Sequence, residues 1–203
     1  MKKITAFLAA LSFIIPLALG GSVFADDIEY RVQKGDTMWK ISRRYEIGLD
    51  ELIAANPQIA DPDLIYPDQI ITIPTGESGV LSVEEEVVRL VNEERAKEGL
   101  MPLSLDWELS RVARYKSQDM HDRGYFGHQS PTYGSPFQMM RSFGMYYRTA
   151  GENIARGQRS AAEVVADWMA SSGHRANILN AGFTKIGVGY VADGNYWTQM
   201  FIG

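Results

Sequence analysis

The sequence opens with a run in which nearly every position is apolar. This run extends from Ile4 to Leu19, follows two lysines, and is succeeded by small residues that end in Val23-Phe24-Ala25. Basic residues, an apolar run and a small-residue cleavage site in this order are typical of a secretory signal peptide. Pro16 interrupts the run, which is short for a spanning helix of about 20 residues. We expect residues 1–25 to be a cleaved signal peptide, with a retained anchor as the alternative.

Residues 28–74 carry a pattern that predicts a small unit with the order strand, helix, helix, strand. Ile28 to Val32 alternates apolar and polar positions, as a half-buried strand does. Two short helices follow, and the second ends at Asn56-Pro57, because the residue before proline disfavours helical angles. Ile70 to Ile73 is expected to be the returning strand. Trp39 lies on the apolar stripe of the first helix, and we expect it in the core, with a platform for a sugar ring as the alternative.

The pattern changes after a polar, glycine-bearing stretch at residues 75–80, which is typical of a linker. Longer amphipathic segments follow over residues 81–203. Capping residues predict four helices, which begin at Ser82, Asp106, Ser135 and Ser160. Lys185 to Val191 and Tyr196 to Ile202 alternate as two strands around a turn. Helices first and a hairpin last predict an α+β fold with helices layered on a sheet.

Composition narrows the class of function. Cysteine is absent from the 203 residues, which excludes disulfides, thiolate metal sites and a cysteine nucleophile. The formal net charge is −5 without a basic tract, so we expect no nucleic-acid partner. Without the two lysines of the leader, 18 basic residues face 25 acidic ones, a charge of −7. An acidic chain does not bind anionic wall polymers by bulk charge, so wall attachment would require a specific module.

The first unit resembles the LysM family over the whole of residues 28–74. The resemblance rests on the segments Tyr30–Ile41, Leu52–Pro57 and Asp63–Pro74. It implies a βααβ fold that binds polymers of N-acetylglucosamine, such as peptidoglycan or a chitin-like glycan. The implied groove lies between two loops, whose residues are Gly35, Asp36, Thr37, Met38, Asn56, Pro57, Gln58 and Ile59. The alternative is that these residues only make turns.

Three titratable residues in the second unit are candidates for chemistry. His128, Glu152 and His174 lie in separate glycine-containing segments that we expect to be loops. Histidines and carboxylates suit zinc binding or proton transfer, although the spacing alone does not establish that they converge. A structural alternative is that Glu152 accepts loop N–H bonds, while Arg175 and Asn177 bind backbone carbonyls. No serine lies in a G-x-S-x-G nucleophile elbow.

The segments around these residues, with Trp107 and the final Tyr196–Phe201 strand, resemble the CAP superfamily, also called SCP. The resemblance covers residues 81–203 and implies an α-β-α sandwich with a central cleft. Many members place two histidines and two acids in that cleft, where Zn or another divalent cation binds. His128, Glu152 and His174 match three of the four. Ser171 stands where the second acid is expected, so the ligand set and the acid–base pair of the family are incomplete here. Two histidines and one glutamate are still a known ligand set for zinc, so Zn is the candidate cofactor.

Three functions follow, all in an exported protein of the cell wall or spore envelope of a Gram-positive bacterium. The first is an interaction protein that docks on peptidoglycan and binds a lipid, peptide, glycan or protein in the CAP cleft. The second is a wall-targeted, metal-assisted hydrolase with Glu152 as base and His128 and His174 as ligands or polarisers. The third is a structural part of spore-coat or cortex assembly, because the LysM segment is similar to those of spore-coat assembly proteins.

Overall fold

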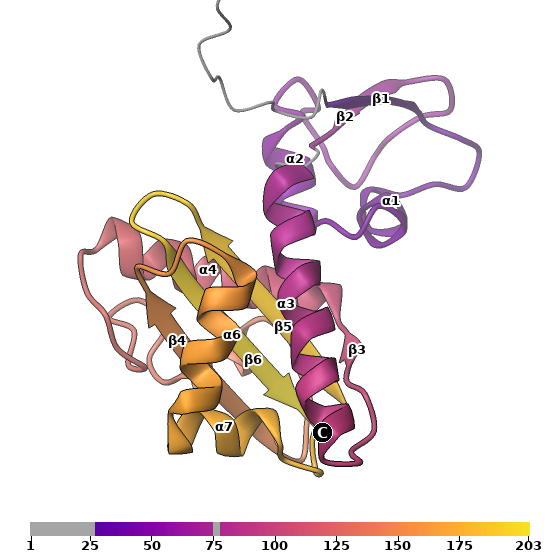
Figure 1. Cartoon of the computed structure of the whole chain (residues 1–203). Coiled ribbons are helices and arrows are strands. Elements are labelled where there is room, and N and C mark those ends of the chain that lie inside the picture. Colours follow the sequence, from indigo (N-terminus) through magenta and orange to yellow (C-terminus); the bar gives the residue numbers. More distant parts are fainter. Residues whose placement is uncertain (1–26, 75–77) are drawn as a thin grey trace, which may run out of the picture.

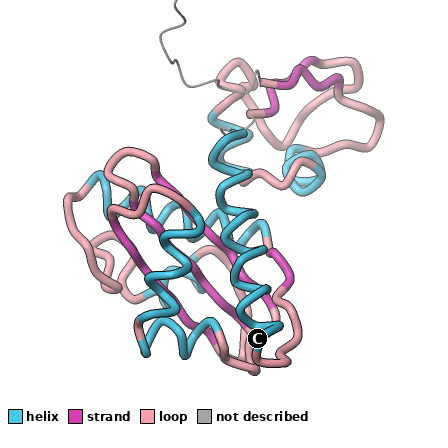
Figure 2. Tube along the Cα trace, in the orientation of Figure 1, coloured by secondary structure: helices cyan, strands magenta, loops and turns pink. Residues whose placement is uncertain are grey.

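The structure is a computed structural model that describes residues 27–74 and 78–203, with backbone alone for residues 78–82. The expected signal peptide lies outside the described residues. The chain forms a small N-terminal module and a larger C-terminal domain, and the long helix α3 starts beside the module and runs along the domain (Figure 1, Figure 2). No helix in the described ranges is long and apolar enough to cross a membrane.

The N-terminal module has the predicted order of elements. These are β1 (Ile28–Arg31), α1 (Met38–Arg44), α2 (Leu49–Ala54) and β2 (Ile70–Ile73). The strands pair antiparallel, with Ile28 opposite Ile73. Thr37 caps α1 by accepting a hydrogen bond from the Lys40 backbone N–H at 3.1 Å. The core is formed by Val32, Met38, Ile41, Leu52, Ile71 and Ile73.

The sequence analysis placed Trp39 in the core, but in the structure Trp39 is 60% exposed. The buried stripe of α1 runs through Met38, Ile41 and Ser42, which follow helical spacing toward the module core. Trp39 follows Met38 by about 100° around the helix, and therefore lies on its flank. A helix of seven residues has room for only one buried stripe.

Helix α3 (Ser78–Lys97) begins inside the segment that the sequence analysis assigned to a linker, and four residues before the predicted start at Ser82. A capping box at Ser82 is compatible with a helix start but does not prevent earlier residues from being helical. No proline lies between residues 78 and 82 to stop the extension. The helix ends before Gly99, whose φ of 69° lies in the left-handed region that glycine tolerates.

The C-terminal domain is built on a four-stranded sheet with the order β3-β5-β6-β4. The strands are β3 (Ser104–Leu105), β4 (Ala150–Arg156), β5 (Lys185–Val191) and β6 (Tyr196–Ile202). β5 and β6 form the predicted terminal hairpin, and β4 pairs antiparallel with β6 at one edge. β3 pairs parallel with β5 at the other edge.

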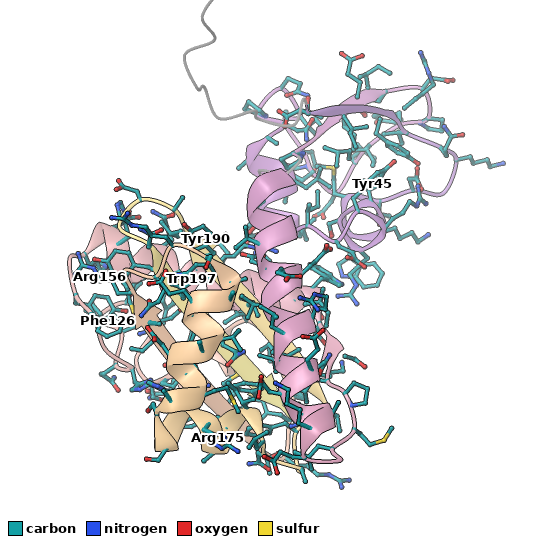
Figure 3. The ribbon with its side chains drawn as sticks, viewed as in Figure 1. Tyr45, Phe126, Arg156, Arg175, Tyr190 and Trp197 are labelled. Carbon is teal, nitrogen blue, oxygen red and sulfur yellow. The ribbon has the colours of Figure 1, made fainter. Side chains whose placement is uncertain are left out.

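Helices cover both faces of this sheet, which confirms the expected α+β fold and its α-β-α layering. They are α3, α4 (Trp107–Asp122), α5 (Pro136–Ser142), α6 (Ala161–Ala170) and α7 (Ser172–Ile178). α3 and α6 lie on one face and α4 on the other (Figure 1). Trp197 of β6 is fully buried under α6 and stacks on Tyr190 of β5 at 4.0 Å between ring centroids (Figure 3). Alternate residues of β6 therefore fill two separate cores.

The N-terminal module rests against the start of α4 through a module interface made by Arg43, Gly48, Glu51, Trp107, Glu108, Arg111 and Tyr115. Glu51 accepts hydrogen bonds from Arg111 Nε at 2.8 and 2.9 Å and from the Tyr115 hydroxyl at 2.8 Å. Arg43 pairs with Glu108, and its guanidinium carbon lies 5.0 Å from the Trp107 ring centroid. The two folded parts are thus joined by charged and aromatic contacts in addition to the chain.

Candidate functional site

His128 and Glu152 form a hydrogen-bonded pair. The Nδ1 atom of His128 lies 2.7 Å from Glu152 Oε1. Glu152 lies on the edge strand β4 opposite Met200, so its side chain points toward the face covered by α4. Its side chain is 1% exposed, whereas that of His128 is 55% exposed. The pair therefore joins a buried carboxylate to an imidazole that solvent can reach.

The local structure of two site residues differs from the expected loops. Glu152 lies within strand β4, and His174 lies in helix α7. Polar side chains at Glu152 and Asn153 interrupt the apolar alternation that identifies a strand. Helix α7 starts directly after α6 with no side-chain cap hydrogen bond, and Gly173 in its first turn weakens the helical pattern. His128 does lie in a loop, between α4 and α5.

Asn153 joins β4 to α7 and thereby positions His174. Its side-chain amide donates to the His174 carbonyl at 3.1 Å and to Gln199 Oε1 at 2.9 Å. Asn177 donates to the Glu152 carbonyl at 3.2 Å and to Asn153 Oδ1 at 2.8 Å. Because Asn153 and Glu152 are adjacent on a strand, they point to opposite faces, and the site is assembled around the sheet edge.

Among the described residues, the Arg175 side chain binds no backbone carbonyl, in contrast to the structural alternative. It pairs with Glu98 at 2.8 Å, close to the C-terminal end of α3 (Figure 3). The predicted carbonyl contact was correct for Asn177. The alternative for Glu152 was wrong, because its observed partner is the His128 side chain rather than loop N–H groups.

Lys116 supports the site from α4, and the sequence analysis missed it. Lys116 is completely buried. The ammonium donates to the Tyr125 hydroxyl at 3.0 Å, the Gly127 carbonyl at 2.8 Å and the His128 carbonyl at 3.1 Å. All three of its hydrogen-bond donors are therefore used to hold the loop that carries His128. Lys116 has the helical spacing of the buried residues Leu109, Val112 and Met120, so a lysine on this apolar stripe is the signal that could have found it.

Burial and charge shift the pKa values of the site residues. Burial raises the pKa of Glu152, against the lowering effects of His128 and Lys116. The hydrogen bond to Glu152 raises the pKa of His128 despite burial. Burial and the neighbouring His128 lower the pKa of His174. The two histidines thus differ, with His128 the more basic one.

Glu152 Oε2 is buried and has no hydrogen-bond partner among the described residues. A buried acceptor without a partner costs about 1–3 kcal/mol, so a ligand or water donor at this atom would be stabilising. The exposed side of the His128 ring faces outward from the same pair. Together these groups can hold a ligand that offers an N–H or O–H group, and they can move a proton between Glu152 and His128.

The donor set does not fit a resident metal ion. Within the described ranges, no three or more His, Asp or Glu residues are grouped so that they could hold one. The oxygen of Glu152 nearest to His128 is already bonded to that ring, and the buried ammonium of Lys116 contributes positive charge beside the pair. Ser171, at the junction of α6 and α7, brings no carboxylate.

The candidate glycan loops of the N-terminal module divide into buried and exposed residues. Met38 is 3% exposed and Asn56 is 1% exposed, so neither side chain offers surface to a ligand. Asn56 instead joins α2 to β2 by bonding the Leu52 carbonyl and both backbone groups of Thr72. Both residues were expected to line a glycan groove, but in the structure Met38 lies in the module core and Asn56 holds α2 against β2.

Asp36 also shapes the first loop. Its carboxylate accepts from the Tyr30 hydroxyl at 2.6 Å, the Gln33 N–H at 2.8 Å and Arg44 at 3.0 Å. The hydrogen bond from Tyr30 and the contacts with Gln33 and Arg44 outweigh burial and lower the pKa of Asp36. Of the predicted groove residues, Gly35, Thr37, Pro57 and Gln58 are exposed, and Asp36 and Ile59 are half-buried.

Comparison with known families gives two matches. The cysteine-rich secretory protein family (CAP) matches residues 88–201, more than half of the chain. The LysM domain matches residues 30–74. Each match coincides with one of the two folded parts, and both agree with the resemblances drawn from the sequence.

Individual relatives cover parts of the chain. The uncharacterized protein YkwD of Bacillus subtilis is 56% identical over 153 residues, which is 75% of this chain and 60% of YkwD. The spore coat assembly protein ExsA of Bacillus cereus is 48% identical over 44 residues, 22% of this chain and 7% of ExsA. The chain thus spans less than two thirds of either relative.

A solved structure agrees with the fold of the C-terminal domain. It is an extracellular protein containing a SCP domain from Bacillus anthracis, 31% identical, with a TM-score of 0.59. The match covers 67% of this chain and 47% of that protein.

Proposed function

Because the chain belongs to the cysteine-rich secretory protein (CAP) family and carries a LysM domain, we propose that it is an exported binding protein of a Gram-positive cell wall. LysM docks it on peptidoglycan, and the CAP domain presents His128, Glu152 and His174 to a second ligand. The acidic composition supports this arrangement, because attachment to an anionic wall then depends on the LysM loops rather than on bulk charge.

The observation that best supports glycan binding is that hydrogen bonds hold both LysM loops in place. Asp36 fixes the first loop through three donors, and Asn56 fixes the second through the Leu52 and Thr72 backbone. Exposed Gly35 and Gln58 remain between these anchors. Gln58 is itself held by a hydrogen bond from its amide to Asn56 Oδ1 at 3.0 Å, and the Gly35 carbonyl by one from Lys40 at 2.7 Å. Loops that are fixed in this way lose little entropy on binding, which favours recognition of acetamido sugars.

The CAP cleft supports recognition of a ligand that donates hydrogen bonds. The unpartnered Oε2 atom of Glu152 is an acceptor, and the half-exposed His128 ring is held beside it. Lys116 holds the backbone of the His128 loop, and Asn153 holds that of His174, in each case through backbone carbonyls. Peptide amides or sugar hydroxyls fit this chemistry better than a bare lipid tail.

Binding to insoluble peptidoglycan tests the docking function. The chain from Asp27 onward is mixed with peptidoglycan or chitin, and the free fraction is measured after sedimentation. We expect retention on peptidoglycan, and Gln58→Ala should weaken it about tenfold, or about 1.4 kcal/mol. Asp50→Asn, on the exposed surface of α2, is the matched control and should bind like the wild type. Equal retention of wild type and Gln58→Ala would argue against these loops as the binding site.

A hydrolase is the second candidate, and the His128–Glu152 pair is the observation that favours it. A hydrogen-bonded carboxylate and an exposed imidazole can act as general acid and base. If this function is correct, the wild type releases soluble fragments from peptidoglycan and Glu152→Gln does not. If both leave the polymer intact while the wild type still binds it, the recognition function stands.

A spore envelope is the second candidate location. The similarity of the LysM segment to that of a spore coat assembly protein supports it. A fluorescent fusion expressed during sporulation would distinguish a location at the spore surface from one in the vegetative wall.

A further inference from the structure

Trp39 is an exposed aromatic side chain directly beside the LysM loops (residues 35–37 and 57–59). Thr37 caps α1, so Trp39 lies in the first turn of the helix that follows the first loop. Trp39 is 60% exposed, whereas Met38 and Ile41 on the same helix are 3% and 0% exposed. Trp39 is therefore a large apolar face that the module leaves uncovered at the end of its groove.

Arg43 continues this surface toward the CAP domain. Residues four apart lie on the same face of a helix, so Arg43 follows Trp39 by one turn, or about 6 Å along the axis. The Arg43 guanidinium then reaches Trp107 and Glu108 in the first turn of α4, with 5.0 Å to the Trp107 ring centroid. Trp107 is half-buried and keeps part of its surface. An aromatic, guanidinium, aromatic series thus crosses from one module to the other.

Contacts elsewhere in the module interface hold this series in register. Glu51 binds Arg111 and Tyr115 of α4 with three hydrogen bonds of 2.8–2.9 Å. Gly48 leaves room for this pair, because a Cβ atom there would lie 1.5 Å from Glu51 Oε2 and 2.2 Å from Arg111 Nε. The relative positions of α2 and α4 are therefore set by specific contacts, and α1 packs on α2 within the same module core.

We propose that the glycan-binding surface continues from the LysM loops along α1 and onto the start of α4. Trp39 and Trp107 stack on sugar rings, and Arg43, whose Nη1 pairs with Glu108, uses its remaining N–H groups to bind a carboxylate carried by the strand. The proposal rests on the proposed function and extends it to a longer substrate. Continuity with the LysM loops favours a polysaccharide as the occupant. The guanidinium favours peptidoglycan over chitin, because peptidoglycan carries carboxylates and chitin is uncharged.

Glycan length is the variable that tests this surface. Peptidoglycan-derived tetrasaccharides and octasaccharides are titrated into the chain from Asp27 onward, with chitin oligomers of equal lengths in parallel. The octasaccharide should bind more tightly than the tetrasaccharide.

Trp39→Ala should weaken octasaccharide binding about fivefold and leave tetrasaccharide binding within about twofold. Arg43→Gln should weaken binding of the peptidoglycan octasaccharide and leave that of chitin unchanged. Tyr146→Ala removes another exposed aromatic ring, 94% exposed on the CAP domain, and should change neither affinity.

Tryptophan fluorescence gives an independent readout. Of the four tryptophans, Trp168 and Trp197 are 1% and 0% exposed, so a change on binding reports mainly Trp39 and Trp107. We expect the long peptidoglycan fragment to change the emission of the wild type, and Trp39→Phe to reduce that change. Thermal unfolding of each variant verifies that it is folded.

The outcomes separate this inference from the proposed function. If neither length of glycan binds the wild type, the proposed function fails, and the extended surface with it. If both lengths bind equally and Trp39→Ala has no effect, docking by the LysM loops stands and the extension to α4 is wrong. If Trp39→Ala abolishes self-association of the chain instead of long-glycan binding, the exposed ring serves a second copy and the inference is likewise overturned.

Discussion

Asp119 of α4 anchors the loop that carries His128. Its carboxylate accepts hydrogen bonds from Tyr125 at 2.6 Å, Ser130 at 2.7 Å and Thr132, and it pairs with Arg123 at 3.0 Å. Burial by itself raises the pKa of Asp119, but these four donors outweigh burial and hold the pKa below its ordinary value. The folded state therefore favours the ionised carboxylate. Lys116 and Asp119, one turn apart on α4, fix opposite parts of the same loop.

Asp119→Asn should lower the free energy of unfolding by about 2 kcal/mol at neutral pH, because charge-assisted hydrogen bonds are lost. A depressed folded pKa contributes stability above the unfolded value of about 4, and this stability is lost as pH falls through the folded value. The difference from wild type should thus be constant from about pH 7 to 5 and shrink below about pH 4. Urea unfolding across this range measures it, with exposed Asp50→Asn as control. A difference that grows toward acid pH would contradict the assignment.

Helix α4 lies unusually close to strand β5, and two glycines make this approach possible. A Cβ atom at Gly187 would lie 2.3 Å from the Leu109 carbonyl carbon. One at Gly189 would lie 2.1 Å from the Arg114 backbone nitrogen. Ser117 of α4 uses the closeness to donate to the Gly189 carbonyl at 2.9 Å. The position of α4 sets that of Lys116, so these glycines support the cleft at a distance.

Gly189→Ala should destabilise the CAP domain by about 3 kcal/mol, because the methyl group would overlap backbone atoms that cannot move independently. Chemical unfolding followed by circular dichroism measures the change. Gly173→Ala is the matched control, since a Cβ atom there meets nothing within 4 Å and alanine favours a helix. A loss of less than about 1 kcal/mol at Gly189 would mean that α4 can shift away from the sheet.

Local signals predicted the elements that end at a cap or a turn. Asp106, Ser135 and Ser160 each cap the helix expected after them. Lys185 to Val191 and Tyr196 to Ile202 have the predicted bounds. These features depend on residues within one helical turn or one hairpin, so they can be predicted from neighbouring positions in the sequence.

The candidate site was only partly predictable, because its geometry depends on distant partners. Glu152 is buried on a strand because His128, 24 residues earlier, and the α4 face cover it. Lys116 is buried because loop carbonyls of Gly127 and His128 satisfy its ammonium. His128, Glu152 and His174 were found through family resemblance, which carries such long-range information, whereas periodicity does not.

At the scale of the whole molecule, the module interface determines whether LysM and CAP act as one body. A linker alone would let the LysM domain reorient freely. The contacts of Glu51 with Arg111 and Tyr115, and of Arg43 with Glu108, oppose that motion. Glycan bound by LysM would then present the CAP cleft to the wall in a fixed direction.

A double-mutant cycle on Glu51 and Arg111 tests this coupling. Their side chains are 34% and 21% exposed, so we expect a coupling energy of about 1 kcal/mol, at the upper end of values for partly exposed pairs. Glu51→Gln, Arg111→Gln and the double variant are unfolded by heat at low and high salt. The coupling should decrease with salt, since screening weakens an exposed pair. The pair Arg89–Glu93 on α3 lies within one helix, with 52% and 55% exposure, and serves as the control with a smaller coupling. If the effects of Glu51→Gln and Arg111→Gln simply add, this ion pair does not couple the two modules, and the fixed orientation loses its principal support.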